Sequence, residues 1–95
     1  RDRSILPALL RSDVFYIGIL GPKRRTERML EELSMSGHDF TGDQLARLYA
    51  PVGLDIGADT PESIALSVAG EIQSVFTRRD GGHLRDRDGS IYDRN

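Results

Sequence analysis

The sequence predicts an α/β fold in which helices flank a parallel sheet, and three observations support this class. Residues 14–20 form a nearly continuous apolar run of β-branched and aromatic residues, typical of a strand buried on both faces of a parallel sheet. Gly21 and Pro22 follow directly and favour a turn into a helix, because glycine tolerates a positive φ and proline suits the first helical position. Apolar residues then recur at helical spacing over 22–36 and again over 60–78.

The composition is that of one small globular domain. The chain has 95 residues, of which 38% are hydrophobic and 29% charged, with a net charge of −2. Partners such as nucleic acid or a membrane surface normally require a large basic excess, so neither is expected. The chain holds no cysteine, which excludes a disulfide or a thiolate zinc site within it, and no apolar run approaches the roughly 20 residues of a membrane span. We therefore expect a cytoplasmic protein.

Two helices are expected on either side of the predicted strand. Residues 5–10 indicate the end of a short helix with Pro7 in its first turn. The helix over 22–36 ends at Gly37, since glycine favours the left-handed conformation that terminates helices. Its apolar stripe consists of Met29, Leu30 and Leu33.

The middle of the chain is expected to hold a second, shorter helix. Thr41 and Gln44 have the spacing of a capping box, which predicts a helix over residues 42–49. Residues 52–57 alternate apolar residues with Gly and Asp and are interpreted as a loop or an edge strand. The inward residues of the helix are expected to be Leu45 and Leu48.

A long helix and a tail complete the chain. Thr60, Pro61 and Glu62 supply a capping hydroxyl, a proline at the first helical position and an acid in the first turn, so a helix is expected from here to about residue 78. We predict that residues 1–78 are part of one domain and residues 79–95 a flexible charged tail. The stripe that we expect to form core is Ile64, Ala65, Val68, Ala69, Ile72, Val75 and Phe76.

A single strand cannot form a sheet, so this pattern indicates an incomplete domain. The strongly apolar strand requires neighbours on both edges and both faces. These come from a preceding part of the same polypeptide, from a separate domain or from a second copy of the chain. A Rossmann-like domain of which only part is present explains the pattern most simply. No Gly-x-Gly-x-x-Gly loop occurs in the sequence.

The turn after the strand is a candidate anion site. Lys23, Arg24 and Arg25 follow Gly21 at the predicted helix N-terminus, where backbone N–H groups already favour phosphate. The alternative is a solvated basic first turn. Gly53, Asp55 and Gly57 are interpreted as residues that let the backbone turn, and the alternative role of Asp55 is to orient Arg24 or Arg25 or to accept from a ligand ribose or N–H group.

Catalytic and metal chemistry have little support in the sequence. No nucleophile–base pair stands out, and the serines lack nucleophile-elbow spacing. His38 and His83 have no acid or thiol cluster near them, so neither is expected to bind metal. We predict no catalytic residue and no metal ligand in this chain.

Two segments in the same order carry a resemblance to a known family. Residues 13–25 (DVFYIGILGPKRR) and 48–65 (LYAPVGLDIGADTPESIA) resemble the C-terminal Rossmann domain of the XdhC/CoxI family, the accessory factors of xanthine dehydrogenase and carbon monoxide dehydrogenase. The resemblance covers residues 5–78, extends weakly to the Gly-Ser-Ile of the tail, and matches only the second half of the domain. One departure is Pro22, where the family usually has a serine.

The resemblance implies an accessory factor that binds molybdenum cofactor and assists its sulfuration and insertion into a molybdenum hydroxylase. Its partners would be the apo-enzyme and a sulfurtransferase, and a homodimer is expected. The protein would act by binding rather than by catalysis. The cofactor-binding residues predicted on this basis are Gly18, Gly21, Lys23, Arg24, Arg25, Asp55 and Gly57.

Two alternatives belong to other functional classes. An NAD(P)-binding oxidoreductase domain would use the basic cluster for a 2′-phosphate, but it would need a fingerprint loop outside this sequence. A non-catalytic oligomerisation module would pair its open strand edges with another copy and bind no ligand.

Overall fold

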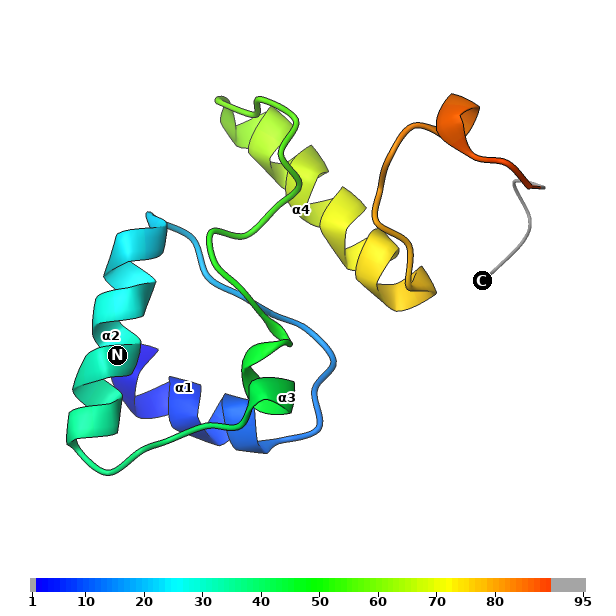
Figure 1. Ribbon diagram of the computed structural model, residues 1–95. Helices are drawn as coiled ribbons and strands as arrows, with labels where there is room; N and C mark the ends of the chain where they lie inside the picture. Colours follow the sequence, from blue (N-terminus) through cyan, green and yellow to red (C-terminus); the bar gives the residue numbers. More distant parts are fainter. Residues whose placement is uncertain (1, 90–95) are drawn as a thin grey trace. The chain divides into compact units, whose positions relative to one another are not determined.

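The computed structural model describes residues 2–89 and divides into two compact units, Arg1–Val52 and Gly53–Asn95 (Figure 1). The first holds helix α1 (Asp2–Arg11), strand β1 (Ile17–Gly18), helix α2 (Lys23–Met35), helix α3 (Gly42–Leu45) and strand β2 (Leu48–Tyr49). The second holds helix α4 (Pro61–Thr77) and the 3₁₀ helix η1 (Leu84–Asp86).

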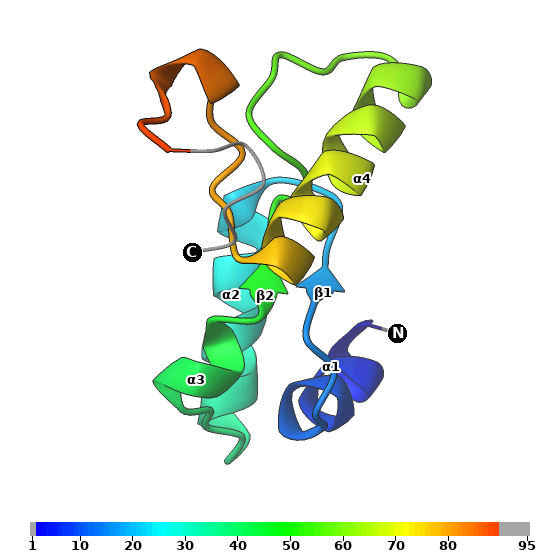
Figure 2. The same ribbon diagram turned by 90° about the vertical axis from the view of Figure 1, so that its right-hand side faces the viewer.

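The first unit is built on a small parallel sheet of two strands. β1 and β2 lie side by side, with Ile17 opposite Leu48 and Gly18 opposite Tyr49 (Figure 2). The N–H of Ile17 donates to the Arg47 carbonyl at 2.8 Å. A small parallel sheet with flanking helices confirms the predicted α/β class and its incomplete sheet.

Strand β1 is much shorter than the predicted strand over residues 14–20. A segment forms ladder hydrogen bonds only where a neighbouring strand faces it, and β2 spans two residues. Val14, Phe15 and Leu20 therefore extend beyond the ladder and are exposed. The apolar run has the composition of a longer strand, but within the described residues only the two-residue strand β2 pairs with it.

The predicted helix over 42–49 is wrong in its second half. The capping box forms as expected, because the N–H of Gln44 donates to Thr41 Oγ1 at 3.1 Å and the N–H of Thr41 donates to Gln44 Oε1 at 2.8 Å. The helix nevertheless ends at Leu45, which is exposed rather than inward. Leu48 and Tyr49 instead form β2, since pairing with β1 supplies backbone partners that a four-residue helix cannot.

The core of the first unit lies between the sheet and helices α1 and α2. Met29 and Leu33 are buried there, and Leu30 packs against them, which confirms the predicted stripe. Pro7 lies in the middle of α1, not in its first turn, because the helix begins at Asp2. Proline cannot donate to the carbonyl four residues earlier, and Pro7 is buried in the core together with Leu6. The buried core residues are Leu6, Leu10, Ile17, Met29 and Leu33.

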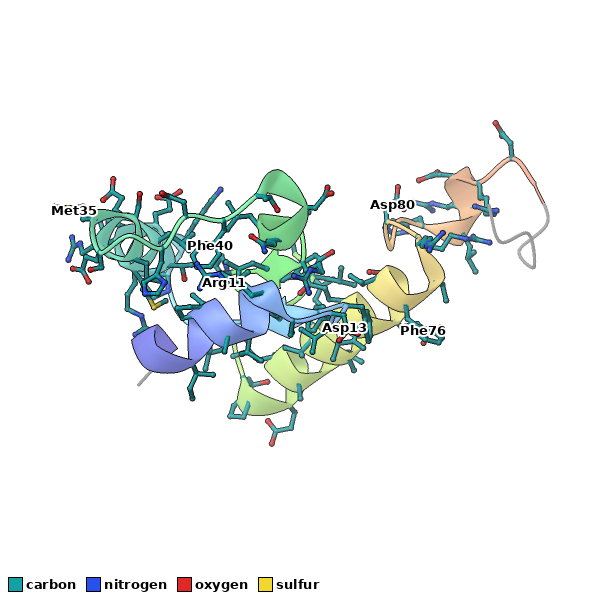
Figure 3. All side chains as sticks on the ribbon, turned by 90° about the horizontal axis from the view of Figure 1, so that it is seen from below. Arg11, Asp13, Met35, Phe40, Phe76 and Asp80 are labelled. Atoms are coloured by element: carbon teal, nitrogen blue, oxygen red, sulfur yellow. The ribbon has the colours of Figure 1, made fainter. Side chains whose placement is uncertain are left out.

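Near the end of α1, Arg11 contacts two groups from the segment that follows α2. Its guanidinium carbon lies 4.9 Å from the centre of the Phe40 ring, and both residues are labelled in Figure 3. Arg11 Nη1 is 3.3 Å from His38 Nδ1. A cation over an aromatic face is attractive. These contacts join the end of α1 to the connection between α2 and α3.

In the second unit, helix α4 begins and ends as predicted. Thr60 Oγ1 accepts from the N–H of Ser63 at 3.1 Å, and Pro61 is the first helical residue. The helix ends at Thr77, followed by Arg78 in a left-handed conformation with φ of 60°. Among the described residues, no helix is long and apolar enough to cross a membrane.

The predicted core stripe of α4 is wrong. Phe76, which is labelled in Figure 3, is 71% exposed, and Ile72 is also exposed. The residues buried on this helix are the polar Ser67 and Glu71. The reason is that α4 packs against the chain just before it through polar groups. The exposed members of the stripe are Ala65, Ala69, Ile72 and Phe76, and the half-buried ones are Ile64, Val68 and Val75.

Residues 52–57, which hydrogen-bond to helix α4, form a loop. The N–H of Gly53 donates to Glu71 Oε1 at 2.9 Å, and the N–H of Leu54 donates to the Ser67 carbonyl at 3.1 Å. Of the two interpretations of residues 52–57, the loop is therefore the correct one. The predicted tail from residue 79 includes η1, and residues 90–95, with most of the Gly-Ser-Ile resemblance, lie outside the described residues.

Candidate anion site at the start of helix α2

The candidate site is the turn between β1 and α2. Gly21 has φ of 110°, a conformation that side chains of L-residues rarely adopt. Pro22 is the N-cap rather than the first helical residue, and it offers no side-chain hydrogen bond to the helix. The first-turn N–H groups of Lys23 and Arg24 consequently have no intrahelical acceptor. An uncapped N-terminus of a 13-residue helix leaves backbone donors and the positive end of the dipole available to an anion.

Arg25 folds back over this turn. Its Nη2 donates to the Leu20 carbonyl at 2.9 Å, and a Cβ built on Gly21 would lie 2.6 Å from the same nitrogen. The positive φ of Gly21 favours glycine at this position, whereas a side chain there would require only that the flexible end of Arg25 move aside. The geometry gives Arg25 a positioning role in the turn.

A shallow hollow of about 330 Å³ opens on the first turns of α2, lined by Pro22, Arg24, Arg25 and Arg28. Lys23 and Arg24 are exposed, which is compatible both with an anion site and with a solvated basic turn. Arg28 was missed. The sequence contained evidence for Arg28, because it lies four residues after Arg24 and this spacing places both guanidinium groups on one face of the helix. Three arginines around free N–H groups form an arrangement suited to a phosphate or carboxylate.

Gly18 lies inside β1 rather than at the turn. A Cβ there would meet Val52 Cγ2 at 2.5 Å and the Tyr16 ring at 3.2 Å, and Tyr16 in turn stacks on Tyr49 with ring centres 5.0 Å apart. The absence of a side chain at Gly18 is therefore explained by packing. A ligand role for Gly18 stays a prediction.

The other two predicted site residues belong to the second unit. Gly57 has φ of 72° with open space around it, and Asp55 is exposed. The positive φ of Gly57 supports its role in turning the backbone. The predicted pairing of Asp55 with Arg24 or Arg25 stays a prediction.

Comparison with known proteins gives a consistent result. A family model described as the XdhC Rossmann domain matches residues 1–72. An uncharacterized protein, YqeB, from Escherichia coli (strain K12) is 38% identical over 82 residues, which is 86% of this chain and 15% of that protein. A protein from Bacillus subtilis (strain 168) that is named as a probable xanthine dehydrogenase subunit is 41% identical over 78 residues, or 82% of this chain and 20% of that protein. The chain thus spans a fifth or less of the length of these relatives, and the match confirms the predicted resemblance.

Proposed function

Because the chain belongs to the XdhC family, we propose that it is part of an accessory factor for a molybdenum hydroxylase of the xanthine dehydrogenase type. Support comes from the 41% identity with the Bacillus subtilis relative, whose name makes it a probable component of xanthine dehydrogenase. The proposed role is to bind molybdenum cofactor in the cytoplasm and to assist its sulfuration and insertion. The proposed partners are the apo-hydroxylase and a sulfurtransferase.

The observation that carries the binding proposal is the uncapped start of α2. The backbone N–H groups of Lys23 and Arg24 supply donors at the positive end of the helix dipole, and Arg24 and Arg28 flank them. Molybdenum cofactor carries a phosphate on its pterin, and this donor set fits a phosphate. The cofactor itself supplies the metal chemistry when bound. The residues of this chain hold the phosphate, and Arg25 keeps the turn in place.

A charge-removal experiment tests this site. We expect the double variant Arg24→Ala/Arg28→Ala to bind molybdenum cofactor at least tenfold more weakly, since each hydrogen bond to a charged group contributes on the order of 1.5–3 kcal/mol. Affinity is measured by titration calorimetry at fixed ionic strength. Arg85→Ala, which removes an exposed cation from the second unit, is the matched control and should retain full affinity. Equal affinities for the double variant and the parent chain would refute the site.

A homodimer is also part of the proposal. The exposed stripe on α4, which includes Ile72 and Phe76, is apolar surface of the kind that subunit interfaces cover. Light scattering over a range of concentrations gives the molar mass directly. A molar mass equal to that of a single chain at every concentration would contradict the proposed homodimer, but it would not bear on the proposed cofactor site.

The alternative of an NADP-binding domain rests on the same arginines. Guanidinium groups commonly hold the 2′-phosphate that distinguishes NADP from NAD. Parallel titrations with the two nucleotides separate the proposals. NADP binding that is much tighter than NAD binding, with no molybdenum cofactor binding, would favour the oxidoreductase domain.

A further inference from the structure

We draw no further inference here: the strongest candidate, the hollow of about 540 Å³ between the second half of helix α4 and the segment 79–87, is lined by both arginine and aspartate side chains that select no single ligand chemistry, and nothing in the structure shows what covers it.

Discussion

Replacing Gly53 with alanine should destabilise the protein by about 2–4 kcal/mol. Gly53 has φ of 109°, and a Cβ there would lie 2.4 Å from the Oγ of Ser67. Ser67 is 3% exposed, and its hydroxyl donates to the Ile64 carbonyl at 2.8 Å, so it cannot move aside without losing that bond. The clash also displaces the Gly53 N–H from Glu71 Oε1. Urea denaturation followed by helical circular dichroism measures the loss.

Gly57→Ala is the matched control for this prediction. Gly57 also has a positive φ, 72°, but a Cβ there meets nothing within 4 Å. It should therefore cost about 1 kcal/mol, from backbone strain alone. Adding Ser67→Ala to Gly53→Ala removes the clashing oxygen and should recover part of the loss. Equal destabilisation by the two glycine substitutions would contradict this account of the loop.

Replacing Arg47 with alanine should cost about 2–3 kcal/mol. Arg47 joins two segments of the first unit, because its Nη2 donates to the Leu10 carbonyl at 2.5 Å and its Nη1 donates to the Val14 carbonyl. The Leu10 carbonyl belongs to the last turn of α1, where a cation is favourable. Without the guanidinium, the end of α1 and the entry to β1 lose their shared anchor. Thermal unfolding followed by circular dichroism measures the change.

A lysine at position 47 tests whether the fork geometry of the Arg47 guanidinium, and not only its charge, joins the two carbonyls. Arg47→Lys keeps the charge but cannot span both carbonyls with a rigid fork, so it should recover less than half of the lost stability. Arg24→Ala, which removes an exposed arginine of the same unit, should change stability by less than about 0.5 kcal/mol. If Arg47→Ala and Arg24→Ala change the free energy of unfolding equally, the hydrogen bonds of Arg47 do not contribute to stability.

Local rules predicted the helices of this chain well. Helix α2 and helix α4 lie where apolar spacing placed them, the predicted capping box of α3 forms, and the Thr60 hydroxyl caps α4 as predicted. Each depends on residues within one turn of one another, so a single sequence contains the whole signal. The positive φ of Gly37 is predictable for the same reason.

Longer-range pairing explains the errors. Strand β2 replaced the end of a predicted helix because β1, which is distant in sequence, pairs with Leu48 and Tyr49. The buried face of α4 is polar because Glu71 and Ser67 hold backbone groups of the preceding loop. Apolar periodicity identifies an apolar face, but it does not say what covers that face.

The basic turn was predicted in its main features. Gly21 adopts the expected positive φ, and Lys23 and Arg24 lie on the first turn of α2. The sequence did not show that Arg25 folds back onto the Leu20 carbonyl, because that contact depends on the path of the turn. Arg28 was overlooked because it lies one helical turn beyond the three adjacent cations that define the basic run.

Amide exchange at the start of α2 tests the central claim most directly. Molybdenum cofactor is added to the parent protein, and exchange of the Lys23 and Arg24 N–H groups is followed by NMR. Anion binding at this N-terminus predicts that both amides slow at least tenfold at saturation, while the N–H of Gly81, which lies in the second unit and has no predicted role in the site, is unaffected. Saturable cofactor binding that leaves Lys23 and Arg24 unprotected would contradict the account.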